Sequence, residues 1–181
     1  MAHLEKTDGV LHQGAVIYGV DWGVEDSPLS IILSSECDIL NDKASFLIVA
    51  MLLPAKETLT QSKEYINKAS GAKDDLLAAK AWKSLCDFLE GYIYNKGITR
   101  YYFIDPRDAI DAPYLLVDFQ HITSIPIDSA KELEIVAQLP SPYKEQMVVQ
   151  FASYTARIPV ERDPDISPIT EFLASPLKKK E

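Results

Sequence analysis

The sequence of 181 residues predicts an α+β domain: a small antiparallel β-barrel with a helical insertion and a C-terminal helix. Three observations lead to this prediction. Short apolar segments bounded by glycine, proline or aspartate occur both early and late in the chain. A long stretch that favours helix separates these two groups. Because the strands are grouped rather than alternating with helices, an antiparallel sheet is favoured over a parallel one.

The strand segments are apolar and are bounded by turn residues. The predicted strands cover residues 15–18, 29–35, 46–53, 100–104 and 114–125. The third of them stops at Pro54, which cannot donate a hydrogen bond to a neighbouring strand. The polar stretch at 36–43 is predicted to be a turn, and the long segment at 114–125 to be one long or bent strand.

Residues 56–97 form the predicted helical insertion. One apolar stripe recurs every three or four residues, which is the spacing of one face of an amphipathic helix. The stripe comprises Leu77, Ala81, Leu85, Phe88 and Tyr92. Asn95 and Gly97 follow it as a stop signal.

The remaining segments are predicted to be helical, with a tail at the end. A short helix is expected at 129–138, and a last helix begins near Ser141-Pro142, because proline is tolerated in a first turn. Its apolar stripe is Tyr143, Met147, Phe151, Tyr154 and Ile158. We expect one domain over 1–160 and a flexible, proline-rich tail over 161–181. The predicted core anchors are Ile32, Ile48, Leu85, Phe88, Val117 and Phe151.

Composition and charge predict a cytoplasmic protein. No apolar run approaches the roughly 18 residues of a membrane span, and the N-terminus lacks the pattern of a signal peptide. The two cysteines, Cys37 and Cys86, are too few for a disulfide framework, so reduced thiols are expected. A net charge of −9 disfavours nucleic-acid binding, which normally needs a basic surface.

The segment with the most varied chemistry follows the second strand. Ser35, Glu36, Cys37 and Asp38 offer a hydroxyl, two carboxylates and a thiol where a buried strand enters a turn. One interpretation is a structural turn that also contacts a partner. The other makes Cys37 a nucleophile with His121 as its base, oriented by Asp38 or Asp118. The first is favoured, because two flanking carboxylates disfavour a thiolate.

Other candidate sites are fewer. Along the strand at 100–104, alternation is expected to turn Tyr101 and Phe103 toward the core and to leave Tyr102 for contact with a ligand. The three histidines lack the paired spacing of metal ligands, and no glycine-rich phosphate loop is present. We therefore predict no metal and no cofactor.

Several segments resemble the MazF-like (PemK-type) toxin family, whose members are SH3-like barrels that cleave RNA. The resemblance is carried by Gly14-Ala15-Val16-Ile17, by Ser27-Pro28-Leu29-Ser30-Ile31-Ile32-Leu33-Ser34, by 47–52, by 116–125 and by the helix from Tyr143. It implies an SH3-like barrel with an insertion. At the family's catalytic arginine this chain has Ser27, and at the catalytic threonine it has Leu53 next to Pro54. These departures predict that the chain neither cuts nor tightly binds single-stranded RNA.

The favoured function is a non-catalytic interaction or regulatory protein, with a protein partner or a second copy of the chain as its ligand. The resemblance places it in a bacterium or phage, in a defence or toxin–antitoxin setting. The Ser35-Glu36-Cys37-Asp38 turn also resembles uncharacterised bacterial and phage proteins. The alternative is a hydrolase or nuclease, either using Cys37, Asp38 and His121 or acting as a divergent MazF-like ribonuclease with relocated residues. A purely structural subunit is the third hypothesis.

Overall fold

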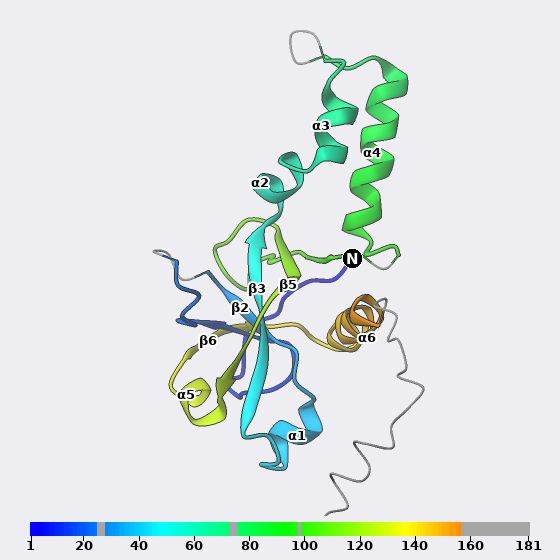
Figure 1. The fold of residues 1–181 in the computed structure, drawn as a ribbon. Coiled ribbons are helices and arrows are strands. Elements are labelled where there is room, and N and C mark those ends of the chain that lie inside the picture. Colours follow the sequence, from blue (N-terminus) through cyan, green and yellow to red (C-terminus); the bar gives the residue numbers. More distant parts are fainter. Residues whose placement is uncertain (25–27, 73–75, 98, 157–181) are drawn as a thin grey trace, which may run out of the picture.

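The computed structural model describes residues 1–24, 28–72, 76–97 and 99–156. Within these ranges one curled antiparallel sheet has the strand order β4-β5-β3-β2-β1-β6 (Figure 1). The strands are β1 (Ala15–Tyr18), β2 (Ser30–Ile32), β3 (Phe46–Pro54), β4 (Tyr101–Ile104), β5 (Leu115–Pro126) and β6 (Glu134–Gln138). The helices are α1 (Glu36–Leu40), α2 (Ala55–Thr60), α3 (Lys63–Ala69), α4 (Ala79–Ile93), α5 (Ile127–Lys131) and α6 (Tyr143–Thr155). The predicted α+β class with an antiparallel sheet is confirmed.

A bulge divides the long strand β5 into two halves. Ala50 of β3 pairs with Ile122, but the next residue, Met51, pairs with Asp118. Residues 119–121 therefore have no partner on β3, and extra residues of this kind bend a strand and redirect its side chains. The half before the bulge, Leu115–Asp118, pairs with β3 on one side and with β4 on the other, and the half after it pairs with β3.

The N-terminal segment joins the two edges of the sheet. The Leu4 N–H donates to the Asp105 carbonyl just beyond β4 at 2.9 Å, and Glu5 exchanges two backbone hydrogen bonds with Gln138 of β6 at 2.9 and 3.0 Å. Ala2 and Leu4 are buried in the main core. The segment thus covers the opening between β4 and β6, a role that no local sequence pattern predicts.

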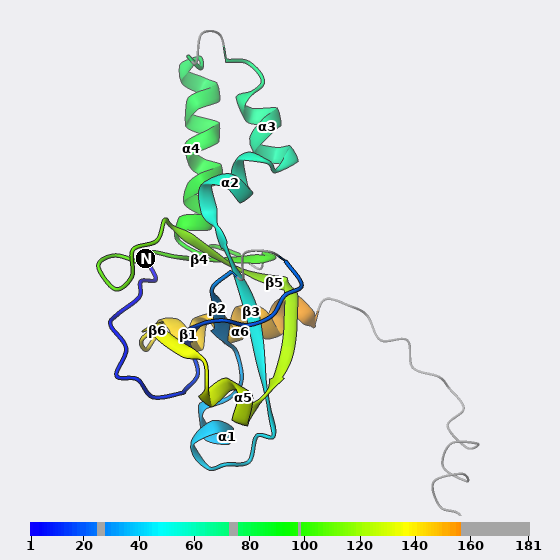
Figure 2. The ribbon, with the colours of Figure 1, turned by 90° about the vertical axis from the view of Figure 1, so that its left-hand side faces the viewer.

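The last helix docks on the sheet as predicted. Met147 of α6 is fully buried in the cluster that also contains Val16, Leu52 and Val117, and Phe151 packs against it half-buried. Ile158, the last residue of the predicted stripe, lies outside the described residues. Figure 2 shows α6 alongside the sheet, away from the insertion.

Two predicted elements are corrected by the structure. The helix expected at 129–138 is a short helix, α5, followed by strand β6, which pairs with β1. Ile135 and Val136 are β-branched and suit a strand, so the pairing outweighs the weak local helix preference. The turn expected at 36–43 contains the short helix α1, which buries Ile39.

The predicted core anchors are confirmed in part. Ile32, Val117 and Leu85 are buried, whereas Phe88 and Phe151 are half-buried. Ile48 is 41% exposed, because Leu47 and Val49 occupy the buried positions of this part of β3 and neighbours in a strand face opposite sides. The prediction for Ile48 was therefore wrong.

Replacing Ile48 by alanine is expected to lower the free energy of unfolding by less than about 1 kcal/mol, because much of the side chain is already in water. Leu47→Ala, one residue away on the buried face, should cost about 2–5 kcal/mol. Urea unfolding of the two variants measures the difference. Equal costs would show that Ile48 is covered in solution.

The helices α2, α3 and α4 project from the end of β3 as a narrow arm (Figures 1 and 2). At its foot Ala55, Leu59, Phe103 and Leu116 form a separate small core. The side-chain amide of Asn95, just after α4, donates to the Phe103 carbonyl at 3.0 Å and accepts from the Phe103 N–H at 2.6 Å. These bonds hold the end of the arm on the edge of β4.

Candidate functional site

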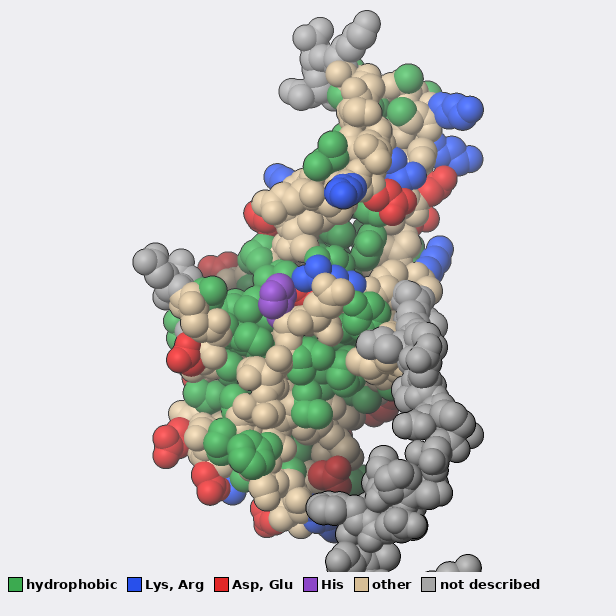
Figure 3. Space-filling view, in the orientation of Figure 1, with side chains coloured by type: hydrophobic (Ala, Val, Ile, Leu, Met, Phe, Trp, Pro, Cys, Tyr) green, Lys and Arg blue, Asp and Glu red, His purple; other side chains and the backbone are tan. Residues whose placement is uncertain are grey.

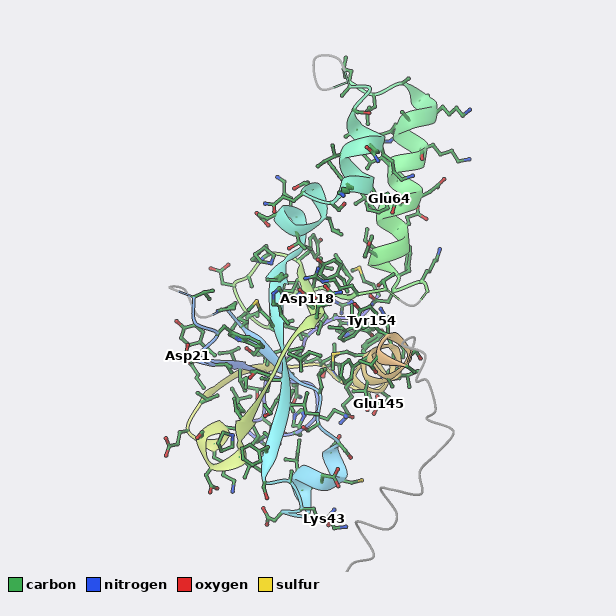
Figure 4. The ribbon with its side chains drawn as sticks, viewed as in Figure 1. Asp21, Lys43, Glu64, Asp118, Glu145 and Tyr154 are labelled. Atoms are coloured by element: carbon green, nitrogen blue, oxygen red, sulfur yellow. The ribbon has the colours of Figure 1, made fainter. Side chains whose placement is uncertain are left out.

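A buried carboxylate stands where β5 begins its bulge. The side chain of Asp118 is completely inaccessible to solvent. Its oxygens accept hydrogen bonds from Arg100 Nε at 2.6 Å and Nη2 at 2.5 Å, from the Gln120 backbone N–H at 3.0 Å, and from His121 Nδ1 at 2.6 Å. Figure 4 labels Asp118 near the foot of the arm. One carboxylate thus organises two cationic or ionisable side chains.

The Asp118 carboxyl is held in its ionised form. Burial by itself opposes ionisation, but hydrogen bonds from Arg100, from the Gln120 N–H and from His121 outweigh it, so the pKa of Asp118 is lowered. The same hydrogen bond raises the pKa of Arg100. An ionised carboxylate can only accept hydrogen bonds, so His121 Nδ1 must carry the proton it donates.

Both partners of Asp118 reach the surface, His121 from the bulge and Arg100 from the residue before β4. The His121 side chain is 53% exposed and that of Arg100 is 34% exposed, although both bind an atom that water does not reach. Figure 3 shows a histidine beside basic side chains at the junction of the arm and the sheet. Within the described part of the chain, His121 Nε2 has no hydrogen-bond partner.

Aromatic residues flank the site from two elements. The Arg100 guanidinium lies over the ring of Tyr101 in β4, with 4.9 Å between its central carbon and the ring centroid. Gln120 donates from its amide to the Tyr154 hydroxyl of α6 at 2.7 Å. The site is therefore built by β4, β5 and α6, which meet only in the folded chain.

This arrangement can move a proton next to a bound anion. In a neutral imidazole whose Nδ1 donates to a carboxylate, the free Nε2 is an acceptor and therefore a general base. The guanidinium is permanently charged and is oriented by a bidentate contact, so its position is well defined. Acyl and phosphoryl transfer both need such a pair of groups.

The structure does not bring together the residues predicted to act with Cys37. The Cys37 helix, α1, lies at the opposite end of the sheet from Asp118 (Figures 1 and 4). Of the two residues proposed to orient His121, Asp118 contacts it and Asp38 does not. The predicted pairing of Cys37 with His121 is therefore corrected, because α1 follows β2 at the end where β3 starts, whereas Asp118 pairs with the second half of β3.

The predicted contact turn is otherwise open to solvent. Ser35, Cys37 and Asp38 are exposed, and Cys37 is a free thiol. Glu36 is half-buried and forms an ion pair with Lys144 of α6. The carboxylate of Glu36 thereby ties α1 to the last helix, and the contact role of the turn stays a prediction.

Tyr102 does not face the solvent as predicted. It is only 1% exposed, its hydroxyl donates to the Tyr143 carbonyl at 3.2 Å, and burial raises the pKa of its phenol. The alternation along β4 is correct but the faces are reversed: Tyr102 shares the core side with its partner Val117. Tyr101, on the other face, is the half-buried tyrosine that reaches the site.

Sequence reasoning missed Arg100 and Gln120. The available signal was Asp118 itself, a carboxylate in the middle of an apolar strand, because a buried charge requires a partner. Among the described residues, no group of three or more His, Cys, Asp or Glu side chains is placed to hold a metal ion. No helix in the same ranges is long and apolar enough to cross a membrane.

Comparisons with known proteins identify no family. No protein-family model matches the chain, and no curated protein shows significant similarity to it. Among solved structures, the chain is similar to an endoribonuclease in complex with its cognate antitoxin from Mycobacterial species. The identity is 12% and the TM-score is 0.43, over 83% of this chain and 100% of that one.

Proposed function

We propose that the protein is an endoribonuclease in which His121 moves a proton and Arg100 binds the scissile phosphate. A single observation carries the proposal: a fully buried carboxylate, Asp118, fixes both a histidine and an arginine whose outer faces reach solvent. Burying a charge is costly, and this one positions two groups of complementary chemistry at one surface point.

The reaction is a transesterification within RNA. His121 Nε2 accepts the proton of a ribose 2′-hydroxyl as the 2′-oxygen forms a bond to phosphorus. The bond from phosphorus to the 5′-oxygen of the next nucleotide breaks, and that oxygen takes a proton from water. Arg100 stabilises the negative charge that grows on the phosphoryl oxygens. The products are a 2′,3′-cyclic phosphate and a 5′-hydroxyl end.

The proposal replaces the expectation that the chain cannot act on RNA. That expectation rested on Ser27 and Leu53, which stand where the MazF-like family has its arginine and threonine; Ser27 lies outside the described residues. Arg100, directly before β4, would supply a cation, and His121 of β5 would supply a proton acceptor. A local pair of this kind does not require a basic protein, so the net charge of −9 is compatible with it. An SH3-like barrel and a toxin–antitoxin setting remain part of the proposal.

A second candidate is the non-catalytic interaction protein. Its support is the arm, where Ile66, Leu76 and Trp82 are all more than half exposed and Leu85 is the buried residue of α4. Large apolar side chains on a projecting hairpin are typical of a surface that meets another protein. A toxin-like nuclease with a protein partner would combine both functions.

Incubation of the purified protein with a mixed RNA pool is expected to produce fragments ending in 2′,3′-cyclic phosphate. His121→Ala should slow this cleavage about 100- to 10,000-fold, the usual contribution of a general base. Lys131→Ala, which changes an exposed cation on α5, is the matched control and should leave the rate unchanged. A 2′-deoxy substrate should not be cleaved, because it lacks the 2′-hydroxyl that attacks phosphorus. No cleavage by the wild type, or equal cleavage by the His121 variant, would refute the proposal.

A further inference from the structure

A pocket of about 480 Å³ opens beside the Arg100 and His121 site. It lies between α2 with its C-terminal turn and the ends of β3 and β4. Its walls are formed by Leu53, Glu57, Thr58, Gln61, Ser62 and Tyr101. Tyr101 belongs to both places, because the Arg100 guanidinium lies over its ring and Tyr101 pairs in register with Asp118. A ligand in the pocket is therefore adjacent to Arg100, one of the two partners of the buried carboxylate.

Of the pocket's four polar side chains other than Tyr101, two already make hydrogen bonds and two are free to bind a ligand. The engaged ones are Thr58, whose hydroxyl donates to the Pro54 carbonyl, and Ser62, whose hydroxyl donates to the Leu59 carbonyl, each at 2.7 Å. The side chains of Glu57 and Gln61 are exposed and make no hydrogen bond or ion pair within the described ranges. They are four residues apart, so they stand one above the other on the same side of a helical turn.

The free side chains of Glu57 and Gln61 favour a planar ligand whose edge carries two adjacent hydrogen-bond donors and an acceptor. A tyrosine ring and a leucine side chain form an apolar wall on which a nucleobase can stack. A carboxylate accepts two hydrogen bonds, and a glutamine amide donates as well as accepts. Of the four RNA bases, only guanine presents two adjacent donors, N1–H and N2–H, followed by an acceptor, O6. Adenine and cytosine place an acceptor next to one amino group, and uracil has a single donor between two acceptors.

We infer that this pocket recognises a guanine base of RNA, with Glu57 accepting from N1–H and N2–H, Gln61 donating to O6 and Tyr101 stacking. The inference rests on the proposed ribonuclease function and names its base specificity. A guanine in this pocket lies next to Arg100, because the guanidinium is over the Tyr101 ring that lines the pocket. Cleavage is therefore expected next to guanosine. Adenosine is rejected because its N1 acceptor would face the carboxylate without a hydrogen between them.

The pocket is tested without any cleavage by calorimetric titration. The full chain is titrated with guanosine 5′-monophosphate and, separately, with adenosine 5′-monophosphate. The guanine nucleotide is expected to bind about 10- to 100-fold more tightly, the discrimination typical of one bidentate contact to a base. Glu57→Gln should abolish the preference, because an amide cannot accept both donors. Glu64→Gln, an exposed change on α3 outside the pocket, is the control and should retain it. His121→Ala should also retain it.

The outcomes separate this inference from the proposed function. Equal binding of the two nucleotides, or a preference that survives Glu57→Gln, refutes the guanine pocket even if the protein cuts RNA at other bases. A guanine preference that depends on Glu57 supports the pocket, even if the wild type cleaves no RNA or His121→Ala cleaves it as fast as the wild type. Cleavage mapped to guanosine and redistributed by Glu57→Gln supports both.

Discussion

Replacement of Asp118 by alanine is expected to lower the free energy of unfolding by about 3–5 kcal/mol, the usual cost of removing one partner from a buried charge pair. The change leaves the Gln120 N–H without its acceptor and places the Arg100 guanidinium beside an apolar hole. The bulge that separates the two halves of β5 would lose its anchor. Urea unfolding followed by circular dichroism measures the loss.

Asp128→Ala is the matched control, because it removes the same side chain from an exposed position on α5 that forms only a surface ion pair with Lys131. It should change the stability by no more than about 0.5 kcal/mol. An Asp118 variant as stable as this control would show that the carboxylate does not organise the bulge.

The decrease in the free energy of unfolding at acid pH should depend on the Asp118 carboxylate. The folded state lowers the pKa of Asp118 below the ordinary aspartate value of 3.8, so the unfolded chain takes up the proton first. The stabilisation that Asp118 contributes is therefore complete above about pH 4. It is lost as the pH falls through the lowered pKa of Asp118 in the folded state. Asp118→Asn, which cannot titrate, should lose less stability than the wild type between pH 5 and 3. If the stability of the wild type and of Asp118→Asn fell equally over this pH range, the loss would not come from Asp118.

Leu4→Ala is expected to cost about 2–5 kcal/mol, because Leu4 is 2% exposed and its loss leaves a cavity in the main core. The residue lies in the segment that joins β4 to β6, so its packing also holds the two sheet edges together. Deleting residues 1–5 should cost more, since it removes the bridging backbone hydrogen bonds as well. Both variants are measured by urea unfolding.

Leu76→Ala is the control for this pair, because Leu76 is 75% exposed on the arm and should change stability by at most about 0.5 kcal/mol. If the shortened chain unfolds at the same urea concentration as the full chain, the N-terminal segment does not close the sheet.

The sequence alone determined the elements whose signal is local. Apolar runs ending at turn residues located β1, β3 and β5, and a stripe of residues at helical spacing located α6. The antiparallel class followed from the order of these elements, because strands joined without intervening helices cannot easily run parallel.

The tertiary structure alone decided what depends on pairing between distant segments. Strand β6 forms because β1 is available to pair with it, and the N-terminal segment is buried because two sheet edges are left open. Alternation along β4 predicts two faces but not which one is covered, so Tyr101 and Tyr102 were exchanged. The candidate site has the same origin: Arg100 and Asp118 are 18 positions apart, and only the pairing of β4 with β5 places the guanidinium on the carboxylate.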